Sequence, residues 1–271
     1  TLPAREIYDF VSAEGNIFET LSAGISWQRV TLNRGLFPTD GSSTALSLSA
    51  TIPGSDINYY RINLRQRFYQ PLSSNFVIGF QGELGYLDAY GDTQETPFFQ
   101  NFYAGGPRSL RGFESNTLGP RSTDAPCYEF NYEEGTCPNL VDTNGDGVPD
   151  EPYYNPYASN NQRSRYRDAP IGGNIKVEGS MQLIFKLPFI EDQRSMRSAF
   201  FFDFGNVFSD NCKDYQINCY KPAVEDLRYS YGVGVTWITG FGPMSFAISK
   251  PTNAGPQERT EEFQFTVGNV F

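Results

Sequence analysis

Arg111 is the residue with the clearest chemical role, because it lies in a glycine-rich stretch that we call the arginine segment, Gly106-Pro107-Arg108-Ser109-Leu110-Arg111-Gly112-Phe113. A guanidinium is a planar fork of donors that can bind a carboxylate at two points, and the glycines permit tight turns. The segment lies in 90–172, which has no strand pattern and is too long for an idle connection. We expect Leu110 to Phe113 to form a motif whose arginine pins the loop to a carboxylate. The alternative is a surface arginine in a mobile loop.

A second segment, Asp142 to Glu151, has the spacing of a calcium-binding loop. Oxygen-bearing side chains alternate along it, and a glycine stands at the sixth position, as in the first half of an EF-hand loop. The ligands would be the side chains of Asp142, Asn144, Asp146 and Asp150 and the backbone carbonyl of Val148. The glutamate expected at position twelve is replaced by Tyr153, although shorter loops of the thrombospondin type do not need it. We expect either a structural Ca²⁺ or an acidic solvated turn, and no other cofactor.

The four cysteines form two close pairs, Cys127 with Cys137 and Cys212 with Cys219. Each pair lies within one polar stretch, so two local disulfides in an oxidising compartment are expected, with the other connectivities left open. The chain contains no His and no CxxC spacing, which disfavours a zinc site. The lack of His also removes the Ser–His and Cys–His pairs of nucleophilic catalysis, so we expect no enzyme.

The elements that would position these residues show apolar side chains at every second position. In 75–89 the even positions are mostly large and apolar, and the odd positions are mostly polar or small. The same alternation recurs in 18–30, 44–52, 58–70, 173–187, 196–208, 227–238, 243–250 and 261–271. A tilted strand needs about 9–11 residues to cross hydrocarbon, whereas strands of soluble proteins average about five to six. The sequence therefore predicts an all-β, antiparallel transmembrane β-barrel over 18–271; a soluble sandwich is the alternative. Residues 1–17 have no convincing pattern.

Composition agrees with a barrel that crosses a membrane. Mean hydropathy is only -0.45, as expected when every second side chain faces lipid, and aromatic residues reach 15%. No run of about 18 apolar residues predicts a transmembrane helix. The net charge of -10 disfavours nucleic acid as a partner. Nothing at Thr1 resembles a signal peptide, so we expect that one was removed or that the chain is a fragment.

Connections of two lengths alternate along the chain. The short ones are 71–74, 188–195 and 240–242, and the long ones are 90–172, 209–226 and 251–260. In outer-membrane barrels short turns are periplasmic and long loops external, which puts the C-terminus on the periplasmic side. Nine strands is an odd number, and an open sheet leaves unpaired backbone groups in lipid. We expect either that the chain is incomplete or that 18–30 lies outside the barrel.

Three segments, in this order, resemble the BamA family of outer-membrane assembly proteins. Thr31 to Gly41 resembles one family segment. Phe102 to Gly106, followed by Leu110 to Phe113, resembles the start and the V/L-R-G-F motif of the loop that folds back into the family's barrel. Phe263 to Phe271 resembles its closing strand with a terminal aromatic residue. The resemblance runs from about Leu21 to Phe271, and it rests on the order of the segments because an RGF tripeptide alone is weak.

The resemblance implies a barrel of sixteen strands preceded by periplasmic POTRA domains, of which this sequence would supply strands eight to sixteen with the external loop 90–172 inserted. In the family the loop arginine meets an acidic residue on the strand after the loop. By register that position is Gln182, which is a departure from the family pattern. Glu178 on the same face and Asp203, whose parity on the next strand turns it toward the interior, remain as candidate partners.

The resemblance also implies a function in folding and inserting outer-membrane proteins without a chemical step. The barrel would open at a seam beside its last strand, which would template a client strand by β-augmentation. The seam residues would be Phe263, Phe265, Val267, Gly268 and Phe271, with Gly268 weakening the pairing. Implied partners are outer-membrane lipids, unfolded client proteins and accessory Bam lipoproteins, in the bacterial outer membrane. The alternatives are a TamA-like or two-partner secretion barrel, a passive porin and a surface adhesin.

Overall fold

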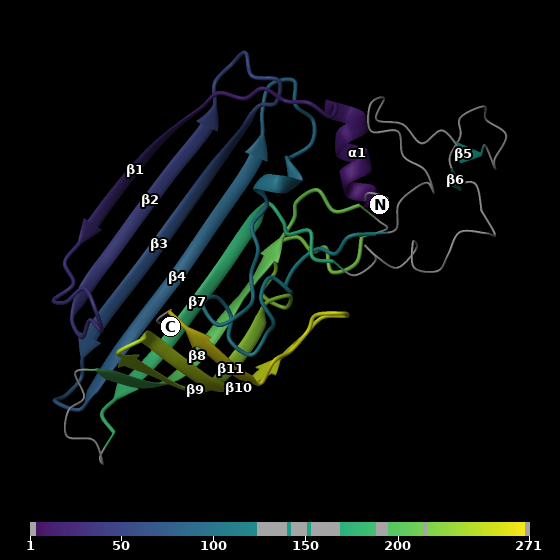
Figure 1. Ribbon diagram of the computed structural model, residues 1–271. Helices are drawn as coiled ribbons and strands as arrows, with labels where there is room; N and C mark the ends of the chain where they lie inside the picture. Colours follow the sequence, from purple (N-terminus) through teal and green to yellow (C-terminus); the bar gives the residue numbers. More distant parts are fainter. Residues whose placement is uncertain are drawn as a thin grey trace.

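Nine antiparallel strands form one sheet in the order β1-β2-β3-β4-β7-β8-β9-β10-β11 (Figure 1). The computed structural model describes residues 4–123, 140–141, 151–152, 169–187, 195–213 and 216–268. The strands are β1 (Ser22–Val30), β2 (Gly41–Thr51), β3 (Tyr59–Pro71), β4 (Phe76–Ala89), β7 (Ile175–Phe185), β8 (Met196–Phe208), β9 (Arg228–Thr239), β10 (Gly242–Thr252) and β11 (Phe263–Val267). The predicted all-β antiparallel sheet is confirmed. It is an unclosed barrel wall, since β1 and β11 end the strand order within the described residues.

The strand register brings the apolar positions of neighbouring strands onto one face. Leu48 of β2, for example, pairs with Ile25 of β1 and Ile62 of β3. Many large side chains of this face are exposed, among them Ile25, Trp27, Leu48, Phe68, Leu84, Met181, Phe200, Phe202, Tyr231, Trp237, Ile248, Phe263 and Phe265. A soluble sheet would bury such a face under a second layer. An exposed apolar band is what a wall in contact with lipid requires.

The opposite face is concave, carries small and polar residues, and receives the inner loop, residues 98–123 (Figure 1). Apolar residues of this loop and of the wall form one buried cluster: Leu87, Phe102, Ala104, Leu110, Phe113, Leu118 and Val207. Glycine on the wall makes room for the loop, because a Cβ at Gly85 would lie 2.6 Å from the ring of Phe102. The inner loop therefore packs as part of the structure.

A helix, α1 (Arg5–Glu14), lies in the segment for which the sequence showed no strand pattern. Phe10 packs edge-on against the rings of Phe18 and Phe98, the second of which belongs to the short 3-10 helix η1 (Phe98–Gln100). Glu6 accepts hydrogen bonds from the backbone N–H and the hydroxyl of Thr123. The helix thus contacts both ends of the inner loop. No helix in the described residues is long and apolar enough to span a membrane.

Several strands differ in length from the sequence prediction, among them β1 and β11. β1 begins at Ser22, because Glu19 and Leu21 instead bond through their N–H groups to the side chains of Asp56 and Ser55. β11 covers Phe263–Val267 and ends before Gly268, whose φ of +82° departs from the extended conformation.

The stretch between β4 and β7 contains one more pair of strands, β5 (Leu140–Val141) and β6 (Glu151–Pro152). They adjoin the two ends of the predicted calcium segment. The ligands themselves (Asp142, Asn144, Asp146, Val148 and Asp150), Cys127, Cys137 and Phe271 lie outside the described residues. The calcium site and the first disulfide therefore stay predictions.

Candidate functional site

Arg111 and Asp203 form a buried, two-point ion pair between the inner loop and β8. The Nε and Nη2 atoms of Arg111 each donate to one carboxylate oxygen of Asp203 at 2.7 Å, and the backbone N–H of Arg111 donates to the same group at 3.2 Å. The side chains are 6% and 0% exposed. Arg111 also donates to Ser180 Oγ of β7 at 3.0 Å. The guanidinium lies 3.5 Å from the ring centroid of Phe201, which adds a cation–π contact.

The register of the wall explains why these groups meet. Ser180 pairs directly with Asp203, and Gln182 pairs with Phe201, so all four side chains belong to the concave face. Gly112 follows the arginine with a φ of +87°, and a Cβ there would lie 2.8 Å from Ser230 Oγ of β9. A glycine is therefore needed for the loop backbone to approach the wall this closely.

The other two predicted partners of Arg111 have different roles. Glu178 accepts a hydrogen bond from the hydroxyl of Ser109 and an ion pair from Lys176 at 3.0 Å, so it binds the loop two residues before the arginine. Gln182 is buried and its amide donates to Ser180 Oγ at 3.4 Å, which places it beside the arginine's own contact. The structure therefore brings Asp203 to the arginine, as parity on the strand predicted.

The far side of the arginine segment contacts the last strand, which the sequence did not predict. The Gly112 N–H donates to Gln264 Oε1 at 3.2 Å, and Gln264 Nε2 donates to the Phe113 carbonyl at 2.8 Å. Next to it, the Glu261 N–H donates to the Gly112 carbonyl and the Glu114 N–H to the Arg259 carbonyl, both at 2.9 Å. The only signal in the sequence was parity, since Gln264 is a polar residue at an inward position between two outward phenylalanines.

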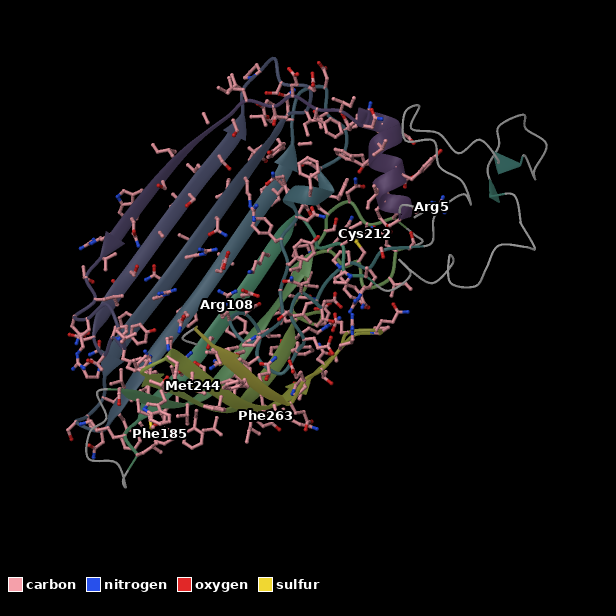
Figure 2. The ribbon with its side chains drawn as sticks, viewed as in Figure 1. Arg5, Arg108, Phe185, Cys212, Met244 and Phe263 are labelled. Carbon is pink, nitrogen blue, oxygen red and sulfur yellow. A yellow bond between two sulfur atoms is a disulfide. The ribbon has the colours of Figure 1, made fainter. Side chains whose placement is uncertain are left out.

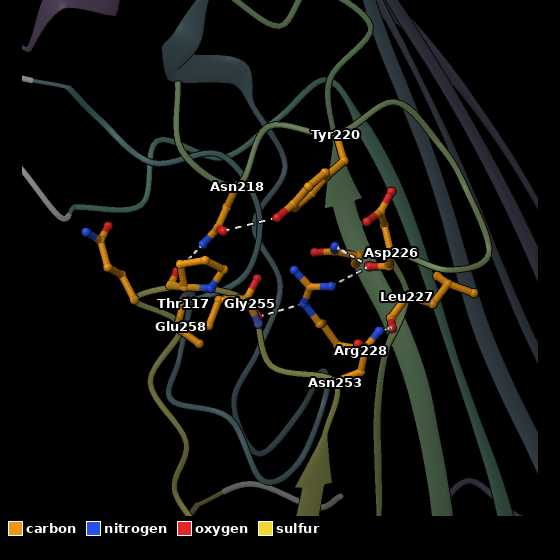
Figure 3. A network of polar contacts seen from close by, with 12 residues as sticks. Thr117, Asn218, Tyr220, Asp226, Leu227, Arg228, Asn253, Gly255 and Glu258 are labelled. Atoms are coloured by element: carbon orange, nitrogen blue, oxygen red, sulfur yellow. Dashed lines mark hydrogen bonds and ion pairs between the residues drawn. The ribbon is translucent and has the colours of Figure 1, made fainter. Parts of the chain in front are cut away.

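A second buried network holds the chain just before the last strand (Figure 3). Arg228 of β9 forms an ion pair of 2.7 Å with Glu258, and the two side chains are 4% and 0% exposed. Glu258 also accepts from the Gly255 N–H at 2.6 Å. Arg121, which is fully buried, donates from the inner loop to the carbonyl of Gln257 at 2.6 Å. The inner loop is therefore joined to the segment before β11 at two places, through Arg121 and through the backbone of Gly112 and Glu114.

Cys212 and Cys219 form a disulfide, as the sequence predicted (Cys212 is labelled in Figure 2). The bridged loop is joined to the inner loop, because the Arg121 N–H donates to the carbonyl of Ile217 at 2.9 Å. It is also joined to the segment after β4, because Lys213 Nζ lies 2.8 Å from a carboxylate oxygen of Glu95. The disulfide thus closes a loop that contacts both the inner loop and the segment after β4.

A polar cavity of about 570 Å³ lies between the arginine segment and β3, β4 and β7. Its lining carries charges of both signs, namely Arg65, Arg67, Arg108, Lys176, Glu83 and Glu178. Tyr103 also lines it, and burial raises the pKa of its phenol, so the group stays neutral at physiological pH. Mixed charges of this kind suit a hydrated interior.

Comparison with known proteins agrees with this geometry. The Omp85 superfamily domain matches residues 3–271. The outer membrane protein assembly factor BamA of Neisseria meningitidis serogroup B is 30% identical over 263 residues, which are 91% of this chain and 28% of that protein. The sorting and assembly machinery component 50 homolog of Mus musculus is 24% identical over 191 residues, 69% of this chain and 31% of that protein. The chain thus spans about a third or less of these relatives.

A solved structure gives the same result for the fold. The crystal structure of BamA from Haemophilus ducreyi lacking POTRA domains 1-3 matches 98% of this chain and 47% of that chain, with a TM-score of 0.73 and 28% sequence identity. The resemblance to the BamA family that the three sequence segments indicated is confirmed. Because the domain match covers residues 3–271, the chain belongs to the Omp85 superfamily.

Proposed function

We propose that this chain is part of a barrel that folds and inserts outer-membrane proteins in the bacterial outer membrane. The observation that carries the proposal is the arginine segment, held to the wall by Arg111–Asp203 and to the last strand by Gln264. A loop that spans the interior from β8 to β11 connects the body of the wall with the edge where a seam would open. A passive porin, by contrast, has a water-filled channel as its interior.

The mechanism that follows is template pairing. β11 pairs with β10 over five positions, so fewer hydrogen bonds hold it than hold the longer strands. Once the seam opens, the free edge of β11 can pair with a strand of an unfolded client, and the backbone hydrogen bonds of this β-augmentation supply affinity without reading sequence. Phe263, Phe265 and Val267 are exposed on the outer face and would meet lipid beside the client. No covalent step is involved, so the activity is assembly rather than enzymatic chemistry.

The remaining partners and the orientation belong to the same proposal. Long loops would be external and the C-terminus periplasmic, and periplasmic POTRA domains and accessory lipoproteins would deliver clients, as the resemblance to BamA implies. A TamA-like or two-partner secretion barrel is the second candidate, and Thr31 to Gly41, which resembles a BamA segment, is the observation that favours BamA over it.

The test uses the full-length protein in liposomes with an unfolded outer-membrane protein as client. We expect the wild type to speed client folding and Arg111→Ala to slow it while its own barrel still forms, as judged by gel mobility before and after heating. Normal client folding by Arg111→Ala would contradict the role of the motif. Planar bilayers separate the porin alternative, because a porin gives large, steady conductance and an assembly barrel with an occupied interior gives small, erratic conductance.

A further inference from the structure

The last strand is held by its neighbour over a short length and, in addition, from inside the barrel. β11 pairs with β10 at Met244 to Ile248. Outside these positions the Ser249 N–H donates to the Glu262 carbonyl at 2.8 Å, the Gly268 N–H donates to the Pro243 carbonyl at 2.7 Å, and Lys250 Nζ lies 2.9 Å from the carboxylate of Glu262. β10 continues to Thr252. The residues that precede β11, 259–261, do not pair with it there and instead bond to the inner loop. The residues just before β11 therefore take their position from the inner loop.

The Gln264 side chain makes the most specific of these contacts. It is 1% exposed, and its amide uses both of its functions, since Oε1 accepts from the Gly112 N–H and Nε2 donates to the Phe113 carbonyl. Only a side chain with an acceptor and a donor on one group satisfies both backbone groups at this place. Leaving two buried backbone groups without partners is costly.

The contact continues along the chain on both sides. Phe113 and Thr260 form an antiparallel bridge, flanked by the bonds of Glu261 with Gly112 and of Glu114 with Arg259. Arg111, which directly precedes Gly112 in the inner loop, is bound to Asp203 of β8. One short piece of the inner loop thus binds β8 through a side chain and the start of β11 through its backbone.

We infer that Gln264 is a positioning residue that couples the Arg111–Asp203 pair to the last strand. Together the two contacts fix the direction in which β11 leaves the interior, and so keep its edge in place as a template. The inference rests on the proposed function, because it names what regulates the edge that a client would meet. Releasing either contact should loosen the same strand.

The experiment measures amide hydrogen exchange of residues 259–267 in the full-length protein in liposomes, beside client folding. Gln264→Met keeps the shape and loses both hydrogen bonds, so we expect exchange there to rise about tenfold and client folding to slow. Thr266→Val is the matched control, because Thr266 lies on the same strand and face and its hydroxyl has no hydrogen-bond partner among the described residues. Arg111→Lys should raise exchange at the same amides, although it lies on the other side of the contact.

Each outcome decides the inference. Unchanged exchange in Gln264→Met overturns it whether or not clients fold, and so does raised exchange with client folding at the wild-type rate. Exchange that rises equally in Thr266→Val also overturns it, since the effect would then belong to the strand and not to the amide. If Gln264→Met does not fold, Gln264→Asn, which withdraws the amide by one methylene, takes its place. A wild type that does not speed client folding would contradict the proposed function alone, and the exchange data would still test the contact.

Discussion

A buried guanidinium needs a partner that matches its shape, and Asp203 provides it. The carboxylate takes the two parallel bonds of the fork, Ser180 takes a third, and the ring of Phe201 covers the flat face. A lysine could supply the charge but neither the second parallel bond nor the flat face. At this site the geometry of the group matters as much as its charge.

We expect Arg111→Ala to lower the free energy of unfolding by about 3 kcal/mol, because it leaves the Asp203 carboxylate buried without its partner. Arg65→Ala is the control: Arg65 pairs with Glu83 on the same wall, but its side chain is 64% exposed, so the loss should stay below about 1 kcal/mol. Urea titration of the protein in liposomes, followed by tryptophan fluorescence, measures both. Equal losses would mean that burial does not set the strength of the Arg111 pair.

The strands were predictable because the sheet repeats one rule. In every strand the side chains alternate between the outer and the inner face, and the sequence shows this alternation in nine segments. The alternation was therefore enough to predict nine strands and to place Asp203 on the inner face. Helix α1 was not predicted, because its ten residues do not alternate as a strand does and only one of them, Phe10, is buried. The contact of Gln264 with Gly112 was not predicted, because it joins residues 152 positions apart. Neither the alternation of a strand nor the composition of a loop indicates which distant residues will be in contact.

The disulfide of Cys212 and Cys219 should act on the loops and not on the wall. Its closure constrains a loop of a few residues, worth roughly 2 kcal/mol by chain entropy. Within that loop Ile217 accepts from Arg121, and Asn218 donates to the Pro256 carbonyl in the segment before β11 (Figure 3). Loss of the bridge should therefore loosen the bonds at Ile217 and Asn218 first.

We expect the double variant Cys212→Ser and Cys219→Ser to speed amide exchange in 209–220 and at Arg121, and to leave exchange in β8 and β9 unchanged. Replacing the pair is preferable to a reducing agent, which would not distinguish this disulfide from the predicted one between Cys127 and Cys137. Equally faster exchange in the strands would show that the disulfide supports the wall itself. Unchanged exchange at Arg121 would show that the loops do not depend on the bridge.

The outer face of the sheet is apolar, and no second layer covers it within the described residues. Its leucines, isoleucines and aromatic residues are exposed over the full width of the sheet, whereas the inner face holds the loop, the ion pairs and the polar cavity. Figure 2 shows Phe263 and Met244 on the last two strands, at the edge of this surface. In water such a face would associate with other copies, whereas in a bilayer it is solvated by the hydrocarbon and needs no second layer.

Two adjacent residues at the middle of β2 test this directly. Leu48 points outward and Ser47 inward, and both are exposed in the sheet. If hydrocarbon wets the outer face, Leu48→Arg places a charge in the bilayer and should cost about 2–4 kcal/mol of folding free energy near the midplane. Ser47→Arg places the same charge on the same strand in the hydrated interior and should cost well under 1 kcal/mol.

In a soluble sheet the Leu48 variant would not be the costlier of the two, because an exposed Leu48 would already face water and its replacement by arginine would be nearly neutral. Equilibrium unfolding of both variants in liposomes measures the difference, and equal values for the two would contradict a lipid-facing wall.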